Sequence, residues 1–206
     1  MALAVSDTPL PWLVKLAPAA FSKRMNRELA ALAISRIARN DPRMAAEQLE
    51  RIESNLQSGE KGWAWGQIGW QAAQRHMGEA LAWFRKAGDA PLAEEAAQWK
   101  VRAALRAQDW GAVRATIEKM PASLAAQPVW TYWLGRAYRA GGRVEDANQL
   151  YARIAGQPNF YGNLADEELG RRISVPPKTT APTREEMAKV SELTGIRRGL
   201  ALLRLN

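Results

Sequence analysis

The chain has 206 residues, of which 47% are hydrophobic and nine are Trp. This length and composition allow one packed domain, or one domain plus a fragment, and exclude disorder of the whole chain. The sequence has no Cys and a single His, His76. Disulfides, thiolate nucleophiles and cysteine-ligated zinc are therefore excluded, and a lone imidazole predicts no metal site.

The charge of the chain is strongly basic, with 29 Lys and Arg residues against 21 Asp and Glu and a net charge of +8. A basic surface favours polyanionic partners such as nucleic acid, lipid headgroups or cell-wall polymer, without choosing among them. No run of roughly 18 apolar residues is present, so no membrane span is expected. The segment 1–16 lacks a basic start and is interrupted by Asp7, Pro9 and Pro11, which argues against a signal peptide.

Helical periodicity begins near Asn26 and continues to about Leu169, which predicts one amphipathic helix after another. Two segments show the pattern most clearly at i, i+3, i+4, i+7 and i+8: Ala30, Ala33, Ile34, Ile37 and Ala38, and later Trp130, Trp133, Leu134, Ala137 and Tyr138. Helices of roughly 10 to 17 residues with short connections should pack antiparallel on their neighbours.

Helix boundaries are predicted from capping residues. Asp41 before Pro42 and Asp89 shortly before Pro91 are expected to be N-caps, because a carboxylate accepts from the first N–H groups and proline fits the first turn. Glycine adopts the left-handed cap conformation at low cost. The glycines expected to end helices are Gly59, Gly88, Gly141, Gly142 and Gly156.

An internal repeat is visible at an offset of 34 residues, where the segment from Trp99 aligns with that from Trp133 and Arg102 aligns with Arg136. Second helices are predicted at equivalent places, namely 45–52, 80–87, 113–120 and 147–154, with Leu49, Phe84, Ile117 and Tyr151 at matching positions. This period is typical of tetratricopeptide-like hairpins. We therefore predict an all-α fold, a right-handed superhelical solenoid over residues 1–172, whose curvature creates a concave face.

The amino-acid composition of the sequence changes after Arg172. Residues 173–183 are rich in proline and hydroxyl residues and are predicted to be a linker. Helical periodicity resumes over 184–206, with Thr183 as the expected cap and the apolar positions Val190, Leu193, Ile196, Leu200 and Leu203. We expect this segment to be the beginning of a second helical domain, truncated from a longer polypeptide.

Signatures of catalysis are missing from the sequence. There is no phosphate-binding loop, dinucleotide fingerprint, nucleophile elbow or zinc-protease motif, so no catalytic, cofactor-binding or metal-binding residues are predicted. Adjacent carboxylates on a helix point about 100° apart and do not share a site, which indicates solvated faces. The pairs concerned are Glu94 and Glu95, Glu167 and Glu168, and Glu185 and Glu186.

Two sets of residues allow both a structural and a binding interpretation. The aromatic cluster Trp63, Trp65 and Trp70, flanked by Lys61 and Arg75, could stack sugars or bases, or could join helix to helix. The second set consists of arginines that could form a basic ridge or an ordinary solvated surface. Its members are Arg102, Arg106, Arg114, Arg136, Arg139 and Arg143.

Several motifs together resemble the end of the superhelical domain of soluble lytic transglycosylases. They are the helix with Trp130, Tyr132, Trp133 and Arg136, the hairpin from Ala147, and the segment Phe160-Tyr161-Gly162. The stretch Ala33 to Pro42 is similar to an upstream repeat, and Thr194 to Arg204 to the opening of the family's linker domain. The resemblance covers most of residues 30–206.

This resemblance implies a periplasmic enzyme of murein turnover that cleaves the β-1,4 bond between N-acetylmuramic acid and N-acetylglucosamine, with a 1,6-anhydro product and no cofactor. The catalytic Glu of the family begins a Glu-Ser motif followed by a Gly-Leu-Met-Gln-type signature. Here Glu53-Ser54 is the sole Glu-Ser, lies in a predicted repeat helix and lacks that signature. The chain is therefore expected to lack the catalytic domain and to be inactive alone.

The sequence is compatible with two functions. The first is a scaffold portion of a peptidoglycan-processing enzyme, whose partners would be the catalytic domain and, weakly, glycan strands. The second is a free-standing tetratricopeptide-like adaptor that binds a protein in its groove. Nucleic-acid binding through the basic surface is a weaker alternative.

Overall fold

The structure, a computed structural model, describes residues 2–172 and 178–205. All regular structure in these residues is helical, with fourteen α-helices, two 3-10 helices and no strand. The predicted all-α fold is therefore confirmed. The chain divides into two compact units, Met1–Ile173 and Ser174–Asn206, which are described separately.

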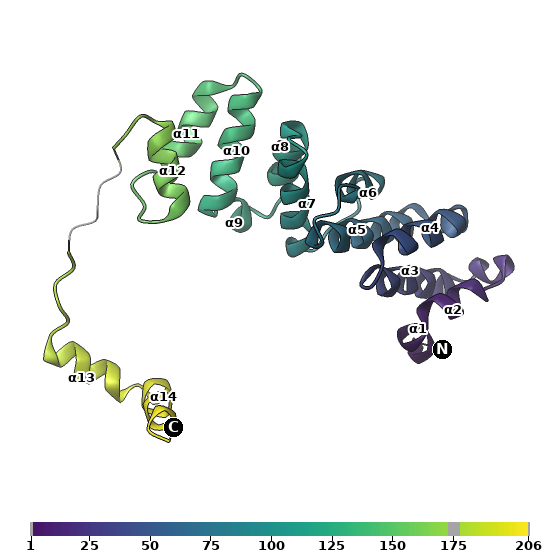
Figure 1. Cartoon of the computed structure of the whole chain (residues 1–206), viewed down its shortest axis with the longest axis horizontal. Helices are drawn as coiled ribbons and strands as arrows, with labels where there is room; N and C mark the ends of the chain where they lie inside the picture. The colour runs from purple at the N-terminus through teal and green to yellow at the C-terminus, as the bar shows by residue number, and fades with distance from the viewer. Residues whose placement is uncertain (1, 173–177, 206) are drawn as a thin grey trace. The chain divides into compact units, whose positions relative to one another are not determined.

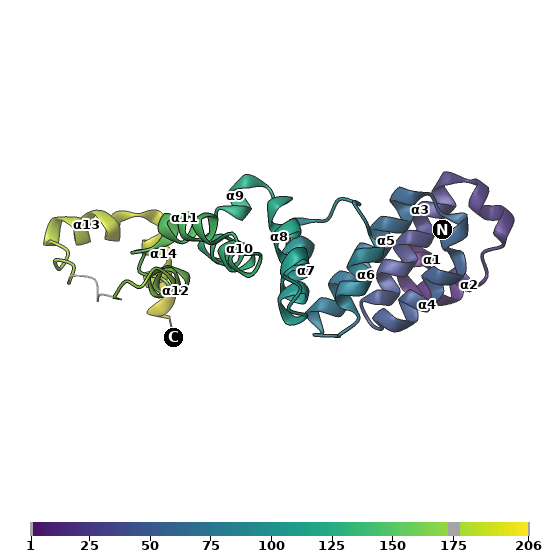
Figure 2. The same ribbon diagram turned by 90° about the horizontal axis from the view of Figure 1, so that it is seen from above.

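The helices of the first unit follow one another in chain order, each beside its sequence neighbours (Figures 1 and 2). Helix α3 packs on α4 and α5, α5 on α6 and α7, α7 on α8, α8 on α10, and α10 on α11 and α12. The bounds are α1 Ala2–Asp7, α2 Pro9–Val14, η1 Pro18–Ser22, α3 Arg24–Ala38, α4 Pro42–Ile52, η2 Glu53–Asn55, α5 Ser58–Gln74, α6 Ala80–Lys86, α7 Glu94–Arg106, α8 Trp110–Glu118, α9 Ala122–Ala125, α10 Pro128–Ala140, α11 Val144–Ile154 and α12 Phe160–Glu168.

The predicted second helices are present as α4, α6, α8 and α11. Their equivalent apolar positions are all fully buried, at 0% exposure: Leu49, Phe84, Ile117 and Tyr151. Burial of each such side chain contributes about 1.5–3 kcal/mol. The repeat spacing in the sequence therefore corresponds to a repeated packing position in the core, whereas the handedness of the stack and its tetratricopeptide-like character stay predictions.

The predicted N-caps have different outcomes. Asp41 is confirmed, since its carboxylate accepts from the backbone N–H groups of Arg43 and Met44, both at 3.0 Å. The prediction that Asp89 is an N-cap is wrong, because α7 begins only at Glu94 after a non-helical segment. The Asp89 carboxylate instead accepts from Lys119 Nζ at 2.6 Å.

The predicted glycine stops are confirmed at three helix ends. Left-handed backbone follows α6, α10 and α11, with φ values of +61°, +78° and +75° at Gly88, Gly142 and Gly156. Gly141 is the C-cap of α10. The prediction that Gly59 ends a helix is wrong, since Gly59 lies in the first turn of α5. A capping box between Gln57 and Glu60 marks the start of α5.

The sequence pattern missed the elements at the N-terminus. Helices α1 and α2 have six residues each, too short for a periodic pattern to stand out. They are nevertheless part of the core, since Val5, Leu13 and Phe21 are buried. The core therefore begins about twenty residues before the predicted start at Asn26.

Glycines on α5 allow close contact with the following hairpin. A Cβ atom built at Gly69 would lie 2.8 Å from Cγ of Phe84 on α6. Such contacts are absent from real packing, so a larger residue would displace the ring. The absence of a side chain at this position therefore lets Phe84 reach full burial.

The second unit contains α13 Arg184–Glu192 and α14 Thr194–Leu203. The helical periodicity predicted from residue 184 is divided between two helices, because the backbone is extended at Leu193 (ψ 126°). The Thr183 cap is confirmed by a capping box with Glu186. Of the predicted linker, residues 173–177 lie outside the described residues and 178–183 contain no helix. Across both units, no described helix is long and apolar enough to cross a membrane.

Candidate functional site

The motifs that carry the resemblance meet where α10 packs on α12. Tyr132, Arg136 and Arg139 are spaced i, i+4 and i+7, so they share one face of α10. That face points toward Glu168 in the last turn of α12. Two cations and a phenol thus converge on one carboxylate.

The polar network around Glu168 uses both of its oxygens. Tyr132 Oη donates to Oε1 at 3.3 Å, and Arg136 Nη1 lies 3.3 Å from the same atom. Arg136 Nη1 also donates to Tyr132 Oη at 3.0 Å, while Arg139 Nη1 donates to Oε2. The Glu168 side chain is only 18% exposed, so these charge-assisted bonds are partly shielded from water.

Aromatic rings surround this network. The Tyr132 ring centroid lies 5.3 Å from that of Trp133 and 5.7 Å from those of Tyr151 and Tyr161. The Tyr151 hydroxyl is buried without a hydrogen-bond partner among the described residues. Burial raises the pKa of the Tyr132 and Tyr151 hydroxyls, because the phenolate would lose its hydration. At neutral pH both rings are therefore uncharged packing elements.

Steric contacts explain the glycine of the Phe160-Tyr161-Gly162 segment. Asn159 caps α12 by accepting from the Gly162 N–H at 2.9 Å. A Cβ atom at Gly162 would lie 2.3 Å from the carbonyl oxygen of Gln157. This position therefore requires glycine. The neighbouring Phe160 is 68% exposed, so its ring is available at the surface.

The prediction that Glu167 and Glu168 both lie on a solvated face is wrong for Glu168. Glu167 is exposed, but Glu168 is partly buried and paired. The signal was present in the helical pattern, because Tyr161, Leu164 and Ala165 stand at i, i+3 and i+4 and Glu168 at i+7. A carboxylate on the apolar face of a helix indicates a buried cationic partner.

The other carboxylate pairs remain apart from this network. Glu94 and Glu95 are exposed in the first turn of α7. Glu186 belongs to the capping box of α13, where hydrogen bonds from Thr183 lower the pKa of its carboxyl. None of these three forms a shared acid–base site with its neighbour.

Glu53 has a structural role. It lies in the 3-10 turn η2 rather than in the predicted repeat helix, and its Oε2 accepts from Nε1 of Trp65 at 3.1 Å. Trp65 is 1% exposed, so this ring belongs to the core. Trp63, in contrast, is 36% exposed. The aromatic cluster is thus divided between packing and surface.

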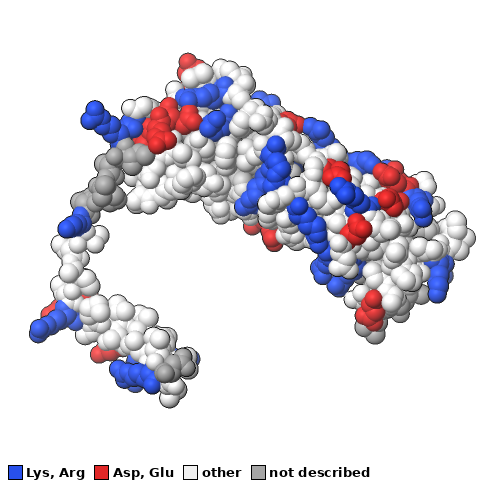
Figure 3. All heavy atoms as spheres, viewed as in Figure 1, with Lys and Arg blue, Asp and Glu red and all other residues white. Residues whose placement is uncertain are grey.

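The predicted basic ridge is not one patch. Arg102 stacks over Trp99 and Trp130, at 4.9 and 5.2 Å from the ring centroids. Arg136 and Arg139 are paired with Glu168, as described above. Figure 3 shows Lys and Arg side chains interspersed with Asp and Glu along the visible face of the first unit.

The remaining arginines of the ridge differ in their partners. Arg143 pairs with Asp146 at 2.7 Å. Arg106 and Arg114 are exposed and form no ion pair within the described ranges. The guanidinium groups of these two residues are therefore accessible to an external anion.

A glycosidic general acid needs a carboxyl with a raised pKa. The carboxyls of Glu79 and Asp89 instead have lowered pKa values, caused first by hydrogen bonds from Arg43 and Lys119. No cluster of three His, Asp or Glu side chains that could hold a metal occurs among the described residues.

Comparison with solved structures finds similarity to the X-ray structure of an inactive mutant of the lytic transglycosylase Slt from Pseudomonas aeruginosa. The TM-score is 0.70 and the identity 25%, and the match covers 100% of this chain and 34% of that chain. This likeness supports a relationship to the lytic transglycosylase family. No family model matches the sequence, and the search of curated proteins found no match.

Proposed function

We propose that the chain forms the non-catalytic superhelical portion of a peptidoglycan lytic transglycosylase, and that it positions a catalytic domain and the glycan strand. The observation that carries this proposal is the structural likeness to Slt over the whole chain at 25% identity. The motifs on α10 and α12 support it, because the residues that carry the sequence resemblance pack against one another in the structure. The chain spans 34% of the length of that structure.

The reaction proposed for the complete enzyme is the family's cleavage of the bond between N-acetylmuramic acid and N-acetylglucosamine, with a 1,6-anhydro product. We place that enzyme in the periplasm, where its polymer is found. This chain alone would release no anhydromuropeptides, because its sole Glu-Ser, Glu53-Ser54, lacks the Gly-Leu-Met-Gln-type signature of the family.

The contact proposed with the cell wall is weak and electrostatic. The net charge of +8 attracts the acidic stem peptides. Exposed Trp63 and Phe160 offer apolar faces for sugar rings. Because the Debye length is about 8 Å at physiological ionic strength, the attraction should fade as salt rises.

Sedimentation of the purified chain with purified sacculi tests this proposal. We expect binding at low ionic strength that decreases steadily with added salt, and no anhydromuropeptides in the supernatant. Anhydro products in proportion to added protein would contradict the scaffold role. Tight, salt-insensitive binding to an unrelated protein would instead support the adaptor. Reading the coding DNA beyond Asn206 for a Glu-Ser and Gly-Leu-Met-Gln signature is an independent test.

A further inference from the structure

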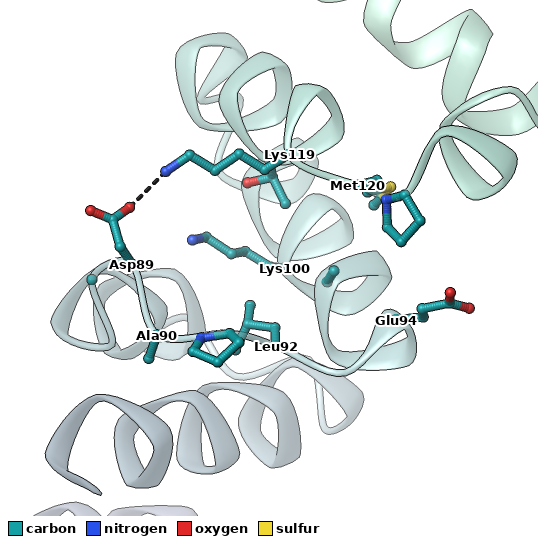
Figure 4. Close-up of a pocket in the computed structure, with 12 residues that line it drawn as sticks. Asp89, Ala90, Leu92, Glu94, Lys100, Lys119 and Met120 are labelled. Carbon is teal, nitrogen blue, oxygen red and sulfur yellow. Dashed lines mark hydrogen bonds and ion pairs between the residues drawn. The ribbon is translucent and has the colours of Figure 1, made fainter. Parts of the chain in front are cut away.

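A cavity of about 360 Å³ lies between the segment that precedes α7, the body of α7 and the end of α8 (Figure 4). Its volume is within the range of small-ligand pockets, about 300–1,000 Å³. Apolar and polar groups are segregated in it. The apolar lining is Pro91, Leu92, Met120 and Pro121, and the cationic lining is Lys100 and Lys119.

Lys100 is the unusual residue of this cavity. Its side chain projects between the two walls in Figure 4, and its ammonium forms no ion pair or hydrogen bond with any described residue. Burial lowers the pKa of Lys100, and the charge of Lys119 lowers it further. The charge of Asp89 acts in the opposite direction, but it forms no ion pair with Lys100. A half-buried ammonium without a paired counter-ion is energetically unfavourable, and an anion in the cavity would relieve that cost.

The second lysine is already neutralised. Lys119 Nζ pairs with Asp89 at 2.6 Å, and their side chains are 73% and 90% exposed. Glu94 lies across the cavity from Lys100, and its carboxylate points away from it (Figure 4). Asp89 is thus shared between two ammonium groups, and these three side chains carry a net charge of about +1, which matches a monoanion better than a dianion such as phosphate.

The wall that precedes α7 offers a backbone donor. Leu92 lines the cavity, and its N–H group has no hydrogen-bond partner among the described residues. The next residue, Ala93, is the N-cap of α7, and its backbone is extended, with φ −60° and ψ 151°. An extended backbone with a free donor can pair with a second extended chain.

We infer that this cavity binds the carboxylate end of a short peptide, with the carboxylate on Lys100, small apolar side chains against Leu92 and Met120, and a peptide carbonyl on the free N–H of Leu92. The chemistry of the cavity does not depend on the enzyme to which the chain belongs. It adds a ligand site to a domain whose proposed role is structural.

Binding of acetyl-Ala-Ala to the full chain, followed by NMR of ¹³C-methyl-labelled Met120, tests the inference. We expect saturable shifts of the Met120 methyl signal and no saturable shifts with the peptide amide, which lacks the charge. Lys100→Met keeps the length of the side chain and removes the ammonium. Because a charge-assisted hydrogen bond is lost, we expect it to weaken binding about tenfold or more.

Lys23→Met is the matched control, since Lys23 precedes α3, a helix that does not line the cavity. We expect it to change the affinity less than about twofold, because it alters the net charge equally without removing a group of the cavity. Equal weakening by both variants would overturn the inference, as would equal binding of acid and amide. Acetate binding as tightly as the peptide, or no saturable peptide binding, would overturn it too. Melting curves of Lys100→Met and the wild type should coincide or favour the variant.

Discussion

The guanidinium of Arg139 on α10 and the carboxylate of Glu168 on α12 form an ion pair whose side chains are 36% and 18% exposed. The same carboxylate accepts from Tyr132, and Arg136 bonds to that phenol. One acidic residue therefore satisfies three partners on the neighbouring helix. This network fastens the last helix of the first unit.

Replacing the carboxylate should loosen α12. We expect Glu168→Gln to lower the free energy of unfolding by about 1–2 kcal/mol, because it leaves two partly buried arginines without a counter-charge, and solvent screens part of that loss. Urea denaturation measures the change. Glu167→Gln, at the exposed neighbour, should change it by less than about 0.5 kcal/mol. Equal effects of the two variants would contradict the structural role of Glu168.

The unpartnered Tyr151 hydroxyl predicts a mutation that does not weaken the fold. Tyr151→Phe keeps the ring and removes a buried polar group without a partner. We expect unchanged stability, or a gain of about 1 kcal/mol, at neutral pH. A loss of more than 1 kcal/mol in thermal or urea unfolding would show that the hydroxyl has a partner in solution.

The same tyrosine predicts sensitivity to alkali. Its folded pKa is raised above the ordinary value of 10.0 by burial. The stability that protonated Tyr151 contributes to the folded state is therefore fully present below about pH 10. It is lost as pH rises toward the folded pKa, with a limiting slope of about 1.4 kcal/mol per pH unit. In urea denaturation between pH 9 and 11.5, Tyr151→Phe should flatten this decline. An unchanged slope would contradict the assignment.

Two glycines of α5 predict opposite effects of one substitution. Gly69→Ala places a Cβ atom 2.8 Å from Phe84 Cγ, and we expect a loss of about 1–3 kcal/mol from overpacking. Gly59→Ala meets nothing within 4 Å, and we expect a gain of up to about 1 kcal/mol from helix propensity. Thermal unfolding followed by circular dichroism compares them. A gain at Gly69 would show that α5 and α6 are less closely packed.

Truncation tests the independence of the first unit. A chain of residues 1–172 should unfold cooperatively with nearly the same urea midpoint, because the first unit has its own core. A chain that ends at Pro158 loses α12 and exposes Tyr132 and Tyr151, so its midpoint should fall clearly. Loss of cooperative unfolding in the 1–172 chain would show that the second unit stabilises the first.

Much of the helical order could be predicted from residue spacing. The burial of Leu49, Phe84, Ile117 and Tyr151 follows from their repeat positions, because a helix stacked between neighbours must place the same face inward in each repeat. The Asp41 cap and the left-handed turn at Gly142 were also predictable, since both depend on backbone groups within a few residues.

The partner of a polar side chain was not predictable in this way, since it depends on contacts between helices distant in sequence. Asp89 was expected to cap a helix and instead pairs with Lys119, thirty residues later. Glu168 looked solvated beside Glu167 and instead binds α10. Local sequence determined where this protein forms helices and which face of each is apolar. The tertiary packing alone decided which charges meet, because ion pairs form between surfaces that become adjacent only when the hairpins stack.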